Sequence, residues 1–346
     1  MSKCISHPVS YHAIIAIIEN WPPTLIVLFG LLSLACTPFP ASANSQATRV
    51  MQAAIMSKGN VNYSGERIVE VYSGGQRLRV VRQRIHCKQG DKQRIETVEP
   101  PSEAGSLFVS NGLRIWEYTP QKREVVVRQM QTADSLRRHR QRAADLVASQ
   151  LSLQYGGRKT IASRSVHEII IRDSAGRLLR KCWIDVHTNV ELKMEKYGER
   201  GALSTRQQMT TINYTPRFIN GMFDFVPPRG VAVKTAPPPA TRTTLAQAQR
   251  PAGFKAIVPG YLPPSYVFEQ DKVAVTVYQG KPALWLTFTN GLDTFSLFQS
   301  PCTHSSAQAP LRHDCATHWC GGGICFTLVG ELPSSDIDSL VRSTRR

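Results

Sequence analysis

The sequence predicts a mostly β, α+β protein with two domains behind an export signal. Short β-rich runs separated by turn dipeptides recur over residues 65–213, which is the pattern of an antiparallel sheet. A proline-rich stretch, Ala236–Arg250 (APPPATRTTLAQAQR), then interrupts the pattern, and a second set of alternating strands follows it. A chain of 346 residues has room for two hydrophobic cores, and an apolar content of 42% is that of a globular protein.

The N-terminus indicates export. Thr24–Ala35 (TLIVLFGLLSLA) carries no charge and is shorter than the ~20 residues that span a bilayer, as in a signal peptide. An A-x-A cleavage pattern follows at residues 41–43, so we expect a signal peptide over residues 1–43 and a mature chain that begins at Asn44. Lipidation at Cys36 is the alternative, although Ser33 is a poor residue for that signal.

The first mature domain is expected over residues 44–230. Gln46–Lys58 can form a short helix with one apolar side, and Ala133–Leu153 a longer helix whose basic run, Arg137–Arg142, faces outward. The expected strands before the long helix are Gly65–Tyr72, Gln76–Ile85, Gln93–Val98, Gly105–Ser110, Leu113–Tyr118 and Arg123–Gln129. Those after it are Val166–Arg172, Leu178–Val186, Val190–Tyr197 and Ser204–Asn213.

A linker is expected over residues 231–244 and a smaller α+β domain over residues 245–346. Its strands are predicted in VAVTVYQG, PALWLTFTNG, DTFSLFQS and ICFTLVGEL. A final short helix is predicted over Ser335–Arg342, with Ser334 or Ser335 as its N-cap.

The formal net charge of +17 suits an acidic partner, such as nucleic acid, anionic lipid headgroups or an acidic protein segment. A solvated basic surface is the other interpretation. Nucleic acid is excluded as a partner because the chain is exported and has no RNP-like strand, helix-turn-helix or zinc-finger spacing.

Motifs for catalysis are missing from the sequence. It contains no G-x-S-x-G, H-E-x-x-H, P-loop or C-x-x-C pattern, and Gly321–Gly323 does not follow a βαβ unit. His86 precedes Cys87 directly, but neighbours on a strand point to opposite faces and do not form a catalytic pair. We therefore predict no enzyme activity, no catalytic residue and no cofactor.

Cysteines are concentrated in HDCATHWCGGGICF (His313–Phe326). The six that remain after cleavage are Cys87, Cys182, Cys302, Cys315, Cys320 and Cys325. An even number in an exported protein favours disulfides, although six cysteines allow 15 connectivities. One pairing joins Cys320 to Cys325 across a hairpin and Cys302 to Cys315 around a 14-residue loop, worth roughly 3 kcal/mol. Cys87 and Cys182 are then the third pair.

Zinc is the competing interpretation of the same stretch. The potential ligands are Cys302, His304, His313, Cys315, His318, Cys320 and Cys325. Their spacing is looser than the C-x₂-C of zinc knuckles, and an oxidising compartment favours S–S bonds. We therefore predict disulfides and no metal site, and a partly free set of thiols is a third alternative.

Two phrases in the first domain resemble the LolA/LolB-like superfamily of exported lipid- and lipoprotein-binding folds. They are CWIDVHTNVELKMEKYGERG (Cys182–Gly201) and FINGMFDFVPPRGVAV (Phe218–Val233). The resemblance implies an open antiparallel β-barrel covered by helices, and it spans most of residues 46–230. Ile161–Arg180 is shorter and more polar than is usual for such folds.

The second domain resembles the C-terminal domain of the MucB/RseB family of periplasmic regulators. The similarity rests on GFKAIVPGYLPPSYVF, NGLDTFSLFQ and TLVGELPSSDIDSLVRS, and the cysteine-rich stretch is not part of it. It implies a periplasmic protein that binds the periplasmic region of a membrane-anchored anti-sigma factor and senses lipidic or envelope-stress signals. A lipid or lipoprotein carrier and a metal-binding or redox envelope protein are the alternatives, and a homo-oligomeric state is left open.

A LolA-like cavity can take up an acyl chain because burial of apolar surface gives ~0.8 kcal/mol per CH₂. The large apolar residues on the expected strands are the candidates for its lining, although plain core positions are the other reading. They are Phe108, Trp116, Trp183, Met194 and Met209.

Overall fold

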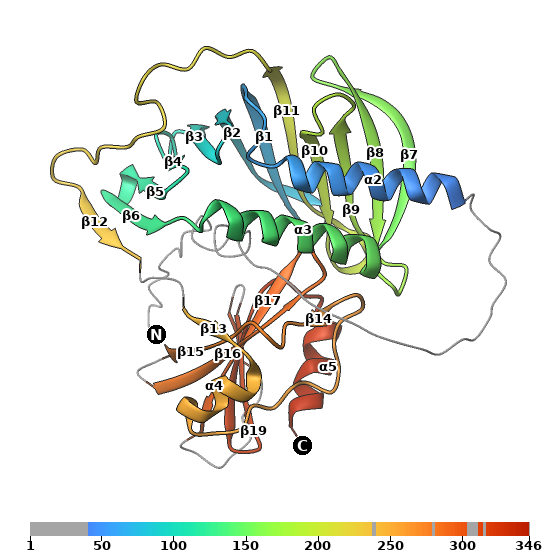
Figure 1. Ribbon diagram of the computed structural model, residues 1–346, viewed down its shortest axis with the longest axis vertical. Coiled ribbons are helices and arrows are strands. Elements are labelled where there is room, and N and C mark those ends of the chain that lie inside the picture. The colour runs from blue at the N-terminus through green and yellow to red at the C-terminus, as the bar shows by residue number, and fades with distance from the viewer. Residues whose placement is uncertain (1–40, 237–239, 279–280, 303–310, 314–315, 346) are drawn as a thin grey trace. The chain divides into compact units, whose positions relative to one another are not determined.

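The computed structural model describes residues 41–236, 240–278, 281–302, 311–313 and 316–345 (Figure 1). The chain divides into two compact units. One takes in the described residues up to Ala240 together with Pro263–Ser265, and the other takes in Thr241–Leu262 and the described residues from Tyr266 onward. Each unit has its own sheet.

A single twelve-stranded sheet forms the first unit. Its strands are β1 (Tyr63–Ser73), β2 (Gln76–Lys88), β3 (Lys92–Glu99), β4 (Leu107–Asn111), β5 (Arg114–Thr119), β6 (Glu124–Gln129), β7 (Ser152–Ile161), β8 (Arg164–Arg172), β9 (Leu178–Asp185), β10 (Glu191–Tyr197), β11 (Leu203–Asn213) and β12 (Ala232–Thr235). Their order is β12-β6-β5-β4-β3-β2-β1-β11-β10-β9-β8-β7. β12 runs parallel to β6 and the other pairs are antiparallel. In the described part of the chain the sheet ends at β12 and β7, so it is open.

Two helices accompany this sheet (Figure 1): α2 (Ala41–Ser57) lies across its β7–β9 part, and α3 (Ala133–Gln150) packs against α2. Both bury apolar residues along one side, including Met51 and Ile55 of α2 and Leu146 and Val147 of α3. The Thr132 hydroxyl accepts a hydrogen bond from Ser135 N–H and caps the start of α3.

The second unit is a smaller sheet with two helices. Its strands are β13 (Arg242–Thr243), β14 (Val267–Phe268), β15 (Val273–Tyr278), β16 (Lys281–Thr289), β17 (Thr294–Pro301), β18 (Leu311–His313), β19 (Ala316–Gly321) and β20 (Ile324–Val329). They follow the order β13-β15-β16-β17-β20-β19-β18, with β14 beside β16. The helices are α4 (Leu245–Ala252) and α5 (Ser334–Thr344).

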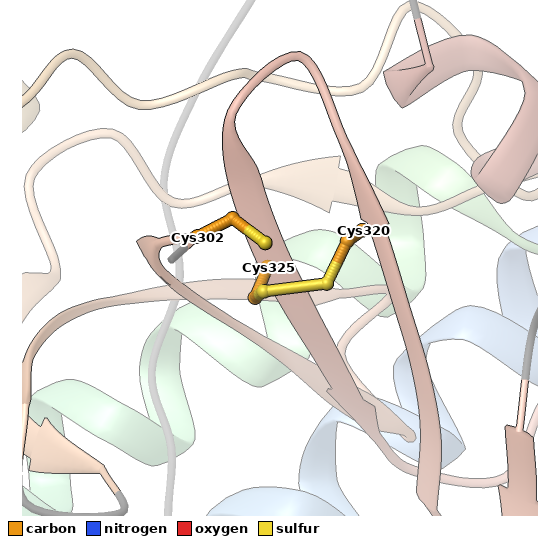
Figure 2. Close-up of side chains that lie close together, drawn as sticks. All are labelled: Cys302, Cys320 and Cys325. Carbon is orange, nitrogen blue, oxygen red and sulfur yellow. A yellow bond between two sulfur atoms is a disulfide. The ribbon is translucent and has the colours of Figure 1, made fainter. Parts of the chain in front are cut away.

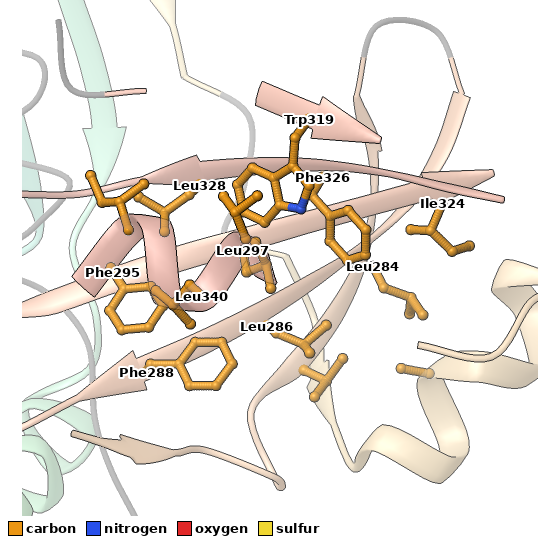
Figure 3. Close-up of a cluster of buried hydrophobic side chains, with 14 of the residues drawn as sticks. Leu284, Leu286, Phe288, Phe295, Leu297, Trp319, Ile324, Phe326, Leu328 and Leu340 are labelled. Carbon is orange, nitrogen blue, oxygen red and sulfur yellow. The ribbon is translucent and has the colours of Figure 1, made fainter. Parts of the chain in front are cut away.

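One core cluster joins sheet and helices in the second unit (Figure 3). Strand residues such as Phe288, Phe295 and Trp319 are almost fully buried in it, and Leu340 of α5 packs against them. The Trp319 indole N–H donates to the Thr344 hydroxyl at 2.9 Å, which ties the end of α5 to β19. The described part of the first unit also contains two short 3₁₀ helices, η1 (Pro120–Lys122) and η2 (Glu199–Gly201).

The predicted fold class, mostly β with open sheets and helices, is confirmed. The elements that were not predicted include α4 and the strands β7, β12, β13, β14 and β18. β7 begins where the long helix was expected to continue, and β12 and β13 lie inside the expected linker. The N-cap of the last helix is Pro333, not Ser334 or Ser335. Within the described ranges, no helix combines the length and apolar character that crossing a bilayer requires.

Candidate functional site

Trp183 and Met209 are the two predicted cavity residues that the structure brings together. They lie on β9 and β11 and share one buried cluster with Ile85, Val166 and Leu192. Both side chains are at least nine-tenths buried. This cluster, referred to below as the Trp183 cluster, is therefore a contiguous apolar group and a candidate contact for an acyl chain.

Met194, Phe108 and Trp116 do not converge on one surface. Met194 lies directly opposite Cys182, whose sequence neighbour is Trp183, so strand alternation turns Met194 and Trp183 to opposite faces. Trp116 lies opposite Val109, the neighbour of Phe108, which likewise separates Phe108 from Trp116. A lining role for the five residues together stays a prediction.

The Trp183 ring also contacts a positively charged side chain. The Lys193 ammonium lies 4.2 Å from the ring centroid, within the range of a cation–π contact. Its Nζ also pairs with Glu195 at 2.9 Å. One side of Trp183 is therefore held by a charged group rather than by apolar packing alone.

A polar network joins three strands next to this lysine. Arg206 on β11 donates through Nε to Glu195 at 3.0 Å and through Nη1 to Glu70 at 3.2 Å. Tyr197 donates to Glu195 at 2.6 Å, and Tyr72 donates to Glu70 at 3.0 Å. Burial would raise the pKa of Glu195, but hydrogen bonds from Tyr197, Lys193 and Arg206 outweigh it and lower that pKa. The network therefore holds both carboxylates ionised.

Sequence reasoning missed this network, although a signal was present. Glu70-Val71-Tyr72 and Glu195-Lys196-Tyr197 share the pattern E-x-Y, and residues two apart on a strand lie on the same face. In both copies the tyrosine donates to the glutamate two positions before it.

The three described cysteines of the second unit, Cys302, Cys320 and Cys325, gather at one hairpin (Figure 2). Cys320 on β19 and Cys325 on β20 form a disulfide, with Cα atoms 4.2 Å apart. The Sγ atoms of Cys302, Cys320 and Cys325 all lie within 4.8 Å of one another. The expected pair Cys302–Cys315 lies partly outside the described residues, since Cys315 is not among them.

The predicted bridge between Cys87 and Cys182 is wrong. Both residues are buried and not disulfide-bonded. Cys87 lies on β2 and Cys182 on β9, and the strands β1, β11 and β10 lie between them in the sheet. Neighbouring strands are about 4.8 Å apart, whereas the two Cα atoms of a disulfide lie within about 7 Å. Burial raises the pKa of both thiols, so neither is an activated nucleophile.

Few of the potential zinc ligands come together in the described residues. His304 and Cys315 lie outside them, as does the side chain of His313. His318 Nδ1 lies 2.9 Å from the Thr327 hydroxyl, and His318 is not part of the sulfur group. The group that could hold a metal ion therefore consists of three sulfurs.

The first unit matches a known protein family. The family model for the MucB/RseB N-terminal domain matches residues 46–236, which is more than half of the chain. The chain belongs to the MucB/RseB family. The predicted resemblance is thereby confirmed.

Solved structures extend the similarity to the second unit. The complex of Pseudomonas aeruginosa MucA and MucB contains a chain that is 16% identical, with a TM-score of 0.56. MucB in a complex with MucA(peri) is 15% identical, with a TM-score of 0.53. Each match covers 86% of this chain and 97% of the other, which is more than the first unit alone can supply. At such identities they show a shared fold. A search of curated proteins finds no match.

Proposed function

We propose that this chain is a periplasmic regulatory protein that binds the periplasmic region of a membrane-anchored anti-sigma factor. Membership of the MucB/RseB family is the observation that carries the proposal. The similar MucB chains are complexed with MucA, in one case with MucA(peri). The export signal expected over residues 1–43 supports the same compartment.

The second unit favours a regulator over a simple lipid carrier. A carrier that works by an apolar cavity needs only the LolA-like sheet and its helices. Here a separate sheet with its own core follows, and the match to MucB includes it. We therefore assign partner binding to a surface that involves the second unit.

Lipid sensing is the finer part of the proposal. The Trp183 cluster is apolar and contiguous, so an acyl chain that displaced or joined its side chains would gain ~0.8 kcal/mol per buried CH₂. Binding of an acyl chain would then change the packing between β9 and β11 and thereby the affinity for the partner.

The partner is tested with the mature chain and the periplasmic regions of the anti-sigma factors encoded in the same genome. Isothermal titration calorimetry should show saturable binding of one of these regions, and a scrambled version of the same region should not bind. Recovery of lipid from envelope extracts without any membrane regulator would contradict the proposal and favour the carrier.

The lipid part is tested by Met209→Ala, with Met194→Ala, a methionine that is not a member of the Trp183 cluster, as the matched control. Met209→Ala should weaken the uptake of a fluorescent fatty acid severalfold, because it removes apolar contact from the Trp183 cluster. Met194→Ala should leave uptake near that of the wild type. Equal losses in both variants would place the acyl chain elsewhere.

A further inference from the structure

The β19–β20 hairpin holds two cysteines on the face that points away from the core. Cys320 and Cys325 lie directly opposite each other in the ladder. Their neighbours Trp319 and Phe326 are buried in the core cluster and stack at 5.1 Å between ring centroids. Strand alternation therefore turns both cysteine side chains to the other face, where they are partly exposed.

Cys302 reaches the same place from β17. That strand pairs with β20, so that Ser300 lies opposite Cys325 and Pro301 opposite Ile324. Directly after the strand, Cys302 N–H donates to the Gly323 carbonyl in the turn of the hairpin at 2.8 Å. Two ladders and this hydrogen bond thus fix the backbone of Cys302 beside the hairpin, and Figure 2 shows the three side chains turned toward one another.

We propose that Cys302, Cys320 and Cys325 form a binding site for Cu(I), closed by the Cys320–Cys325 disulfide and opened by its reduction. The donor set is all sulfur, with no carboxylate or imidazole among the described residues of the group. Soft thiolate ligands select soft cations, of which Cu(I) is stable with three thiolates. Structural zinc sites require a fourth ligand, and the described residues of this group supply three.

The distances between the three sulfur atoms fit a metal–thiolate centre after a small movement of the cysteine side chains. Metal–sulfur bonds of about 2.3 Å at the angles of a trigonal or tetrahedral centre place the sulfurs about 4 Å apart. All three sulfurs already lie within 4.8 Å of one another. The bonded pair must separate by roughly 2 Å on reduction, which rotation about the side-chain bonds can supply.

The redox step balances with a dithiol as the reductant. The dithiol gives two electrons and two protons, the Cys320–Cys325 bond breaks to two thiols, and the dithiol becomes a cyclic disulfide. Binding of Cu(I) then releases the protons of the three thiols to solvent. An oxidant that re-forms the bridge would expel the ion, so this site would report the thiol–disulfide state of the compartment.

The test uses the mature chain, reduced with dithiothreitol under anaerobic conditions and freed of reductant. It is titrated with Cu(I) against bathocuproine disulfonate, whose colour reports the ion that the protein does not hold. The reduced wild type should retain one Cu(I) per chain, and the oxidised wild type should retain none. Cys302→Ser should weaken the affinity at least about tenfold, and it leaves both bridge-forming cysteines in place.

Cys87→Ser is the matched control, because it removes a buried thiol from the other sheet. It should bind as the reduced wild type does. Equal retention by the Cys302→Ser variant, or by the oxidised protein, would overturn the proposal. Circular dichroism of the reduced wild type checks that the protein stays folded, since loss of the fold on reduction would also overturn the proposal.

Discussion

Asp185 is a fully buried carboxylate that stabilises the turn between β9 and β10. Its Oδ1 accepts hydrogen bonds from the backbone N–H groups of His187 at 2.9 Å and Thr188 at 3.0 Å. Its Oδ2 accepts a hydrogen bond from the side-chain Nε of Arg164 at 2.9 Å. Asp185→Ala leaves these donors without their acceptor and should lower the free energy of unfolding by about 3 kcal/mol. Urea unfolding followed by circular dichroism measures the change.

Asp134→Ala is the matched control, since the Asp134 carboxylate is exposed and pairs with Arg137 one turn later. This substitution should lower the free energy of unfolding by less than about 0.5 kcal/mol. An equal loss of unfolding free energy in the two variants would show that the buried hydrogen bonds of Asp185 add no more stability than an exposed ion pair.

The same carboxylate makes stability depend on pH. Burial would raise the pKa of Asp185, but the hydrogen bonds from Arg164, His187 and Thr188 outweigh it, so the pKa is lowered. A lowered pKa in the folded state adds stability above the ordinary Asp value of about 3.9, and this stability is lost as the pH falls through the folded-state pKa. Asp185→Asn should flatten the decline below about pH 4, and an unchanged profile would contradict this assignment.

The cysteine assignments are also open to test at single residues. Denatured, unreduced protein treated with iodoacetamide should carry adducts at Cys87 and Cys182 and none at Cys320 or Cys325. In the native state the first two should react slowly, because burial raises the pKa of their thiols. Peptide mapping by mass spectrometry reads both results. A bridge that links the Cys87 and Cys182 peptides would contradict the strand order of the sheet.

At the scale of the element, the β1–β11 pair depends on a glycine. A Cβ added to Gly65 would lie 2.1 Å from the Thr211 carbonyl oxygen, next to a bulge in the same ladder. Gly65→Ala must therefore push the strands apart and should lower the free energy of unfolding by about 1–3 kcal/mol. Gly198→Ala is the control, because its Cβ would have no neighbour closer than 3.8 Å. Equal thermal unfolding midpoints for the two variants would contradict this assignment.

Most strands were predictable because alternation and turn residues are local signals. QRLRVVRQRI gave β2 within a few residues, and the GGGI spacing gave the Cys320–Cys325 hairpin. β7 was missed because Gly156 and Gly157 interrupt its pattern, where the ladder to β8 has a bulge. α4 was missed because it spans eight residues and contains Pro251. Strand order is a long-range property, so the wrong Cys87–Cys182 pairing and the split of the five cavity candidates could not be foreseen.

At the scale of the whole molecule, each of the two units has a sheet of its own. Each sheet is made of strands from one unit, and the described core cluster of the second unit draws all its members from residues 245–341. Domains of about 100 residues bury enough surface to fold alone. The second unit therefore has the size and the self-contained core of an independent domain.

A fragment of residues 241–346 should fold without the first unit, because its sheet, helices and core lie within these residues. We expect a dispersed amide NMR spectrum and a cooperative thermal transition, reported by the fluorescence of buried Trp319. A fragment that stops at Gly330 is the control: it lacks α5, and with it Leu340 and the Thr344 acceptor of the Trp319 indole, so it should not unfold cooperatively. Random-coil amide shifts in the longer fragment would show that the second unit depends on the first for its fold.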